Sequence, residues 1–92
     1  MLYHIVISPE AQKEFRSLTG YVRAQAEALI DGLASNPRPV RARELRDRSS
    51  IYRIWLASKW RVVYEVNDEQ STILVLRIRR KEYVDYEGVA NR

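Results

Sequence analysis

The amino-acid sequence predicts an α+β fold, in which an N-terminal strand and an antiparallel helical hairpin precede a three-stranded C-terminal meander. The hairpin is expected to pack on one face of a mainly antiparallel sheet. Residues 51–56, 60–66 and 72–79 are rich in β-branched and aromatic side chains and are separated by short polar turns. Between residues 9 and 36, by contrast, apolar residues recur at helical spacing. A chain of 92 residues has room for one core, so we expect residues 1–92 to form a single domain.

The first strand is predicted at residues 2–7, which read Leu-Tyr-His-Ile-Val-Ile and end at Ser8 and Pro9. The sequence does not indicate which edge of the sheet this strand joins. Met1 leads directly into it, and the chain has no apolar run of about 18 residues. We therefore expect no leader, no association with a membrane, and a cytoplasmic location.

Two amphipathic helices are predicted next. Ser8, Pro9 and Glu10 form a helix start, with a capping hydroxyl, a proline at the first helical position and an acid in the first turn. Residues 19–20 predict a break between the helices, and residues 36–37 predict the end of the second. The residues expected to face the sheet are Ala11, Phe15 and Leu18 in the first helix and Val22, Ala26, Leu29, Ile30 and Leu33 in the second.

Residues 37–50 carry five arginines and two prolines, and we predict a basic connector that is anchored by Leu45. This connector could follow the phosphate backbone of a nucleic acid. It could equally be a solvated loop, and the residues do not decide between the two.

Alternation along the meander divides its side chains between two faces, because successive residues of a strand point to opposite sides of a sheet. One face is apolar and is expected to meet the helices; it comprises Tyr52, Ile54, Leu56, Trp60, Val62, Tyr64, Val66, Leu74, Leu76 and Ile78. The other face is mixed and carries four arginines; it comprises Ile51, Arg53, Trp55, Arg61, Val63, Glu65, Ile73, Val75, Arg77 and Arg79.

The lengths of the two turns predict which residues pair across the meander. A three-residue turn at 57–59 pairs Trp55 with Arg61, and a five-residue turn at 67–71 pairs Arg61 with Arg77. Trp55, Arg61 and Arg77 would then form one solvent-facing row. Two facing arginines repel each other at a cost of up to about 1 kcal/mol, whereas an anion between them would be bound by both guanidinium groups. The alternative is a solvated face on which the arginines simply point into water.

Charge and composition narrow the classes of function. Lys and Arg total 16 against 12 Asp and Glu, which gives a net charge of +4 and favours an acidic partner, either a nucleic acid or an acidic protein segment. The absence of cysteine excludes disulfides, zinc ribbons and thiol nucleophiles. A single histidine, His4, excludes a paired-histidine ribonuclease, and no carboxylate cluster suggests a two-metal nuclease. We therefore expect no cofactor and no metal.

Two segments resemble the RelE/ParE toxin superfamily, and in particular RelE-like type II toxins. Residues 52–54 read Tyr-Arg-Ile, and residues 60–69 read Trp-Arg-Val-Val-Tyr-Glu-Val-Asn-Asp-Glu, close to the Y-R-[LV]-[IV]-Y-x-[IV]-x-D-E pattern of that family. The resemblance implies a toxin that enters the ribosomal A site and cuts mRNA, and that a cognate antitoxin holds inactive. Operator DNA would be contacted only through the antitoxin.

The resemblance also implies roles for individual residues. Arg61 matches the arginine that contacts the scissile phosphate, and Lys81, next to Arg80, stands where the family has a catalytic arginine. Tyr86 matches the general base if one residue is missing from the tail, and Tyr83 matches it if the tail is shifted. We expect Arg61, Lys81 and Tyr86 to be catalytic, with Arg80 or Arg53 as an acid or positioning cation.

The residues expected to bind RNA are Arg53, Trp55, Arg77, Arg79 and Tyr83. Arg53 matches a basic strand residue of the family. Trp55 departs from the family pattern, which often has lysine there, and could stack on a base instead of contacting phosphate. Lysine in place of arginine at Lys81 keeps the charge but loses the bidentate fork.

Three functions therefore remain open. The first is a ribosome-dependent, metal-free mRNA endonuclease, and the second is a ParE-like inhibitor of DNA gyrase, which the retained arginines argue against. The third is a degenerate member that only binds its antitoxin, which the departures at Trp55 and Lys81 would favour.

Overall fold

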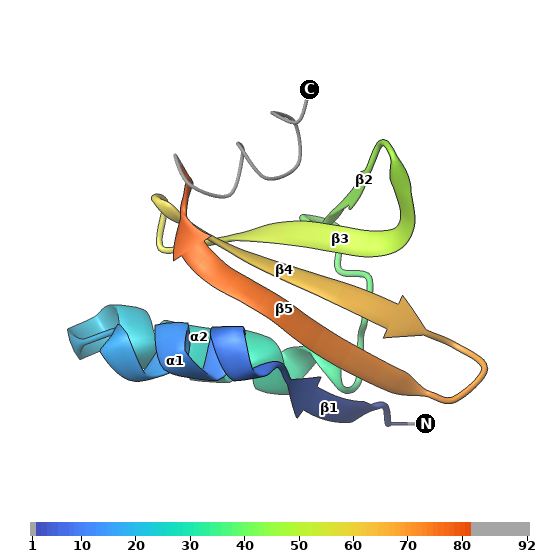
Figure 1. Cartoon of the computed structure of the whole chain (residues 1–92), viewed down its shortest axis with the longest axis horizontal. Coiled ribbons are helices and arrows are strands. Elements are labelled where there is room, and N and C mark those ends of the chain that lie inside the picture. Colours follow the sequence, from blue (N-terminus) through green and yellow to red (C-terminus); the bar gives the residue numbers. More distant parts are fainter. Residues whose placement is uncertain (1, 82–92) are drawn as a thin grey trace.

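The computed structural model describes residues 2–81, which form a five-stranded sheet in the order β1-β5-β4-β3-β2 with two helices on one of its faces (Figure 1). This arrangement confirms the predicted α+β class. The elements are β1 (His4–Ile7), α1 (Pro9–Ser17), α2 (Gly20–Leu33), β2 (Arg43–Leu45), β3 (Arg48–Leu56), β4 (Trp60–Asn67) and β5 (Thr72–Arg80).

The N-terminal strand β1 lies beside β5 and runs parallel to it. Ile5 pairs with Ile73 and Ile7 pairs with Val75, and the backbone N–H of Ser8 donates to the carbonyl of Val75 at 2.9 Å. β1 stops at this point, so the part of β5 beyond Val75 has no strand on that side.

The two helices begin where the sequence predicts. The Ser8 hydroxyl accepts a hydrogen bond from the backbone N–H of Ala11 at 3.1 Å, as expected of the predicted N-cap. Gly20 starts α2 with a φ of +60°, a left-handed conformation that glycine adopts without a steric penalty. The guanidinium carbon of Arg23 lies 5.0 Å from the centre of the Phe15 ring, which joins the two helices.

The core lies between the helices and the sheet. Tyr64 is completely buried, and its hydroxyl donates to the carbonyl of Pro37 at 2.8 Å, which anchors the start of the connector. Burial raises the pKa of Tyr64 to about 12, because the phenolate would be poorly solvated there. The buried cluster comprises Ala11, Leu18, Ala26, Ile30, Leu33, Ile54, Leu56, Val62, Tyr64, Val66, Ile73, Val75 and Ile78.

The sequence predicted only a connector at residues 37–50, but the structure shows more than that. They contain the short strand β2, which pairs antiparallel with β3, and β3 itself begins at Arg48 rather than at residue 51. β2 is an edge strand of only three residues, of which Arg43 and Glu44 are polar and exposed, so it is too short to show an apolar alternation by which it could be recognised. The Glu44 carboxylate accepts the backbone N–H of Ser50 at 2.8 Å and fixes this hairpin.

The predicted pairing of β4 with β5 is wrong. Trp55 does pair with Arg61, as predicted, but Arg61 pairs with Arg79 and not with Arg77. The register shifts between Val63, which faces Arg77, and Tyr64, which faces Val75. Leu76 is therefore an extra residue, a β-bulge in β5.

In the first half of β5, before the bulge, the two faces are exchanged relative to the prediction. Ile73 and Val75, predicted on the mixed face, are completely buried in the core, whereas Leu74 and Leu76, predicted in the core, are only partly buried. The turn 68–71 is one residue shorter than predicted, because β4 extends to Asn67, which pairs with Thr72. A shift by one residue moves every following side chain to the opposite face until the bulge restores the alternation.

Within residues 2–81, neither helix is long and apolar enough to cross a membrane.

Candidate functional site

Trp55, Arg61 and Lys81 form a compact cationic group, here called the Trp55 cluster. The guanidinium carbon of Arg61 lies 4.3 Å from the centre of the Trp55 ring, and the ammonium nitrogen of Lys81 lies 5.7 Å from it. Such cation–π contacts each contribute about 0.5–2 kcal/mol, depending on how far the cation is desolvated. The Trp55 ring therefore gathers two of the predicted site residues around one point.

The cluster lies on the face of the sheet opposite the helices. Ile54, Leu56 and Val62, which flank Trp55 and Arg61 along their strands, all belong to the core cluster on the helical side. Figure 1 shows both helices on a single side of the sheet. Alternation thus places Trp55 and Arg61 on the side that the sequence predicts.

The turn between β3 and β4 brings Lys81 to the cluster. Ala57 and Ser58 have positive φ angles of 50° and 59°, which close a tight turn directly after β3. The carbonyl of Lys59 then accepts the backbone N–H of Lys81 at 2.9 Å, so the end of β5 is tied to this turn. The connector also reaches this corner, because Arg41 donates to the carbonyl of Trp55 at 3.4 Å.

Arg61 is more buried than expected. Only 7% of its surface is exposed, against 37% for Trp55, so Arg61 lies on the predicted face of the sheet but is not exposed to solvent as the predicted row required. The Trp55 ring, 4.3 Å from the guanidinium carbon, contributes to this burial, and β4 lies between two neighbouring strands of the sheet. A phosphate that binds Arg61 therefore meets a partly desolvated cation, for which electrostatic attraction is stronger than in water.

Arg80 lies on the other side of the sheet. It pairs with Trp60, and its guanidinium carbon lies 5.9 Å from the centre of the Trp60 ring. Trp60 packs against the core cluster, and neighbouring strand residues alternate between the faces. The structure thus separates Arg80 from Arg61, although the sequence groups them as catalytic.

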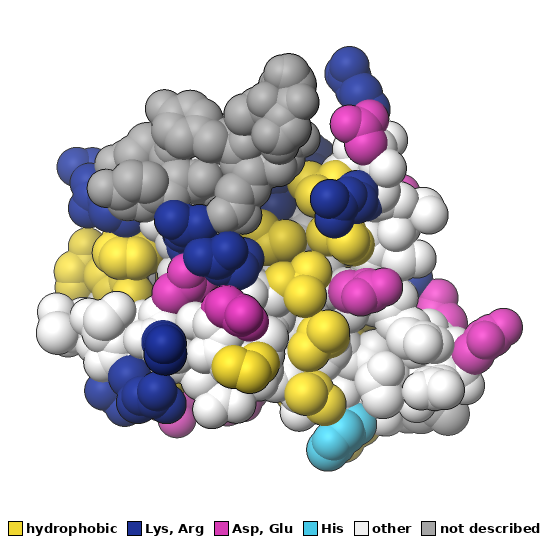
Figure 2. Space-filling model, in the orientation of Figure 1, with side chains coloured by type: hydrophobic (Ala, Val, Ile, Leu, Met, Phe, Trp, Pro, Cys, Tyr) yellow, Lys and Arg dark blue, Asp and Glu magenta, His cyan; other side chains and the backbone are white. Residues whose placement is uncertain are grey.

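Arg77 and Arg79 meet a carboxylate that the sequence reasoning missed. Nε and Nη2 of Arg77 donate to Oε2 of Glu14 at 3.2 and 2.9 Å, and Nε of Arg79 lies 3.5 Å from the same oxygen. The other oxygen, Oε1, accepts the backbone N–H of Ile78 at 2.7 Å. Figure 2 shows basic and acidic side chains directly against each other in the middle of the visible face.

The sequence does contain a signal for Glu14. It follows Ala11 by three residues and precedes Leu18 by four, which puts it on the stripe of α1 that faces the sheet. An acid on a buried stripe needs a partner, and β5 supplies one.

The remaining predicted residues are placed as follows. Arg53 is half-buried and pairs with Val63 in the row next to Trp55 and Arg61. Tyr83 and Tyr86 lie outside the described residues. The RNA-binding and catalytic roles of all these residues stay predictions.

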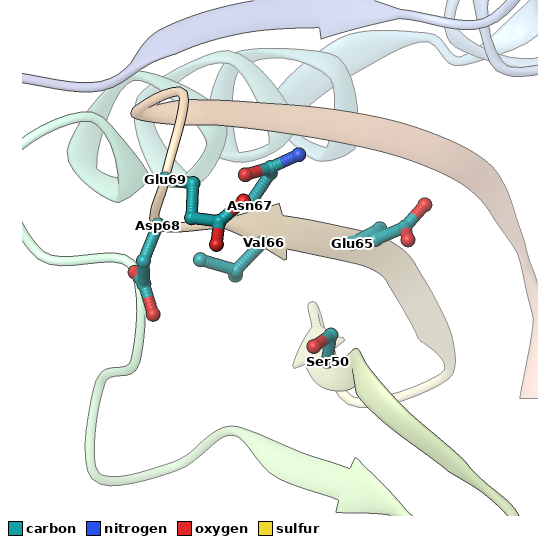
Figure 3. Close-up of a pocket in the computed structure, with 6 residues that line it drawn as sticks. All are labelled: Ser50, Glu65, Val66, Asn67, Asp68 and Glu69. Atoms are coloured by element: carbon teal, nitrogen blue, oxygen red, sulfur yellow. The ribbon is translucent and has the colours of Figure 1, made fainter.

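The opposite end of the sheet is acidic. A hollow of about 310 Å³ lies beside the turn between β4 and β5 and is lined by Ser50, Glu65, Val66, Asn67, Asp68 and Glu69 (Figure 3). Asp68 forms a bidentate pair with Arg38, at 2.8 and 3.2 Å, and accepts the hydroxyl of Tyr3 at 2.6 Å. These bonds, first that from Arg38, lower the pKa of Asp68. A polyanion is therefore disfavoured here and favoured at the Trp55 cluster.

Within residues 2–81, no three His, Cys, Asp or Glu side chains gather closely enough to hold a metal ion.

Comparison with known proteins identifies the family. Residues 5–83 match the family model described as the ParE toxin of the type II toxin–antitoxin system parDE. This chain belongs to the ParE toxin family. The predicted membership of the RelE/ParE superfamily is thereby confirmed, and the chain is a toxin of the type II toxin–antitoxin class.

Curated relatives place this RelE/ParE toxin near RelE. The mRNA interferase toxin RelE of Escherichia coli strain K12 is 32% identical over 83 residues, which cover 89% of this chain and 86% of the relative. A putative RelE-like toxin protein of Escherichia coli is 30% identical over 92 residues, which cover 99% of this chain and 96% of the relative.

Solved structures agree with that placement. The free E. coli toxin RelE, in a form with two arginines replaced by alanine, superimposes with a TM-score of 0.79 at 28% identity and covers 100% of this chain and 98% of that one. RelE in the intact E. coli RelBE toxin–antitoxin complex gives 0.76 at 30% identity, over 85% of this chain and 95% of that one. These likenesses confirm the fold of this RelE/ParE toxin.

Proposed function

We propose that this toxin is a ribosome-dependent endoribonuclease that cleaves mRNA and so inhibits translation. The observation that carries the proposal is the Trp55 cluster, in which Arg61 and Lys81 converge on one aromatic ring on the sheet face opposite the helices. Relatives at 32% identity that carry the name mRNA interferase support it.

The chemistry would use the 2′-hydroxyl of the RNA as the nucleophile. Such cleavage needs a base for that hydroxyl, positive charge at the pentacoordinate phosphorus and an acid for the departing 5′-oxygen. In this proposal Arg61 binds the phosphate through its fork, and Lys81 adds a point charge beside it. Tyr86, or else Tyr83, would be the base. A catalytic role for Arg80 stays a prediction and requires its side chain to leave Trp60.

Binding of single-stranded mRNA would involve the aromatic and basic residues around the cluster. Trp55 is exposed enough to stack on a base, which contributes about 1–3 kcal/mol per base in proteins that bind single strands. Arg53, in the neighbouring row, would contact the backbone.

The ribosome would supply the orientation of the mRNA, which the cations of this site do not provide by themselves. Arginine is a poor proton donor near neutral pH, so the cations alone make a slow nuclease. If the ribosome holds the mRNA in the geometry for in-line attack, this orientation removes much of the free-energy barrier to cleavage. We propose mRNA on the ribosome as the substrate, the cytoplasm as the location and a cognate antitoxin as the inhibitor, with operator DNA contacted only through the antitoxin.

The test is a cell-free translation reaction with one defined mRNA and the purified toxin. Primer extension should reveal new 5′ ends inside ribosome-covered codons and none on the same mRNA without ribosomes. Intact mRNA under both conditions would contradict the proposal.

A ParE-like action on DNA gyrase is the second candidate, because the matching family model is that of ParE toxins. It predicts intact mRNA together with blocked supercoiling of a relaxed plasmid by purified gyrase. A degenerate toxin would leave both reactions unaffected.

A further inference from the structure

Glu14 occupies the open stretch of the β5 edge. β1 pairs with β5 only as far as Val75, so the backbone N–H of Ile78 has no neighbouring strand on that side. Oε1 of Glu14 accepts that N–H at 2.7 Å, and the Ser8 hydroxyl donates to the carbonyl of Leu76 at 3.0 Å. The side chains of Glu14 in α1 and of Ser8, the N-cap of α1, thus bond the backbone of β5 at and beyond the bulge. Figure 1 shows α1 beside β5.

The same carboxylate holds two arginines of the opposite face. Arg77 donates two hydrogen bonds to Oε2, and Arg79 lies within ion-pair distance of it. The three side chains are only partly accessible, with 21% exposure for Glu14, 30% for Arg77 and 26% for Arg79. Partly buried, charge-assisted pairs of this kind are stronger than exposed ones.

The two groups of cations on this face are therefore held by different means. Arg61 and Lys81 lie against the Trp55 ring, which is neutral and does not itself cancel the charge of a cation. Arg77 and Arg79 lie against a carboxylate, which cancels one charge and would repel a phosphate that approached them. A backbone phosphate that approached Arg77 would have to displace Glu14 from it.

We propose that Glu14 is a specificity-determining residue, an internal anion that withholds Arg77 and Arg79 from the RNA backbone and leaves phosphate contacts to the Trp55 cluster. This inference rests on the proposed binding of RNA. It narrows the basic face predicted from sequence to the corner formed by the ends of β3, β4 and β5. RNA is then directed to that corner and is not bound along the whole length of β5.

Salt dependence of RNA binding tests the inference, because each additional phosphate contact to a single strand steepens the slope of log K against log salt by about 0.7. Glu14→Gln keeps an acceptor for Ile78 but removes the charge. It should steepen the slope by about 0.7 for a labelled uridine oligonucleotide, so that between about 200 and about 50 mM KCl it gains about threefold more affinity than the wild type. Glu27→Gln, the same change at an exposed site on α2, is the matched control and should leave the slope unchanged.

A double variant identifies the cation that is released. If Arg77 makes the added phosphate contact, Glu14→Gln combined with Arg77→Gln should return the slope to that of the wild type; if Arg79 makes it, Glu14→Gln combined with Arg79→Gln should do so. Equal slopes for Glu14→Gln and the wild type would overturn the inference. No detectable binding of RNA by the wild type would instead overturn the proposed function on which the inference rests.

A measurement on the wild type covers the case in which Glu14→Gln does not fold. When RNA is added, the ¹⁵N Nε–H resonance of Arg77 should stay in place, because Glu14 remains its partner, while that of Arg61 shifts. A shift of the Arg77 resonance as large as that of Arg61 would overturn the inference.

Discussion

At the scale of single residues, Trp55 determines how the site holds its charge. Its indole ring lies close to two cations, with Arg61 at 4.3 Å and Lys81 at 5.7 Å. The ring is also 37% exposed, so it offers a surface on which a base can stack.

A second residue-scale feature is the network at the acidic end, where Asp68 joins three parts of the chain. Arg38 comes from the connector and Tyr3 from the segment before β1, and both donate to Asp68 in the turn before β5. The Arg38 fork also donates to the hydroxyl of Tyr52 at 2.8 Å. The Asp68 charge thus ties the connector to the sheet.

The free energy of unfolding should consequently depend on pH through the ionisation of Asp68. Its pKa is lowered in the folded protein by the bond from Arg38 and then by that from Tyr3. A carboxyl with a lowered folded-state pKa stabilises the fold fully above its unfolded-state pKa of about 3.9, and this contribution disappears as pH falls through the folded value. Asp68→Asn should be less stable than the wild type at about pH 7, with the difference vanishing near pH 2.

Urea denaturation across that pH range measures the effect. Asp47→Asn, in the exposed turn between β2 and β3, is the control and should follow the wild type throughout. An Asp68→Asn variant that loses as much stability on acidification as the wild type would contradict the role of this carboxylate.

At the scale of elements, the bulge at Leu76 allows apolar residues of both halves of β5 to face the core while Arg77 and Arg79 face the opposite side. Before the bulge, Ile73 and Val75 face the helices. After it, Arg77 and Arg79 pair with Val63 and Arg61 on the opposite face. An uninterrupted β5 could place its apolar residues correctly or its arginines correctly, but not both.

Truncation of two neighbouring residues of β5, which point to opposite faces of the sheet, tests this assignment. Ile73→Ala removes a completely buried side chain and should lower the free energy of unfolding by about 2–5 kcal/mol. Leu74→Ala removes a half-buried one and should cost about 1 kcal/mol. Urea unfolding of both variants gives the order, and the reverse order would support uninterrupted alternation without a bulge.

At the scale of the whole molecule, the sequence predicts the class, the helices and the Trp55–Arg61 pair, because each rests on local chemistry. The cap at Ser8, the break at Gly20 and the odd-numbered turn after Leu56 act within a few residues. The bulge could not be predicted, because residues 73–76 are four consecutive apolar residues and carry no alternation.

The parts of the site that were missed depend on contacts between distant segments. Glu14 meets Arg77 across 63 positions of the chain, and Arg61 is approached by the Trp55 ring of the neighbouring strand. The strand β2 was missed because it has only three residues, two of them polar and exposed. Among these features, only the contact of Glu14 has a signal in the sequence, which is an acidic residue on the buried stripe of a helix.

The proposed phosphate site at the Trp55 cluster is tested most directly by one rate. This is the rate at which the Arg61→Lys variant cleaves ribosome-bound mRNA. Lysine keeps the charge over Trp55 but loses the fork that would bind the phosphate, so the rate should fall about 100-fold while the salt dependence of RNA binding is preserved. Arg16→Lys, at the exposed end of α1, is the control and should cleave at the wild-type rate. Cleavage by Arg61→Lys as fast as by the wild type would contradict a phosphate site at the Trp55 cluster.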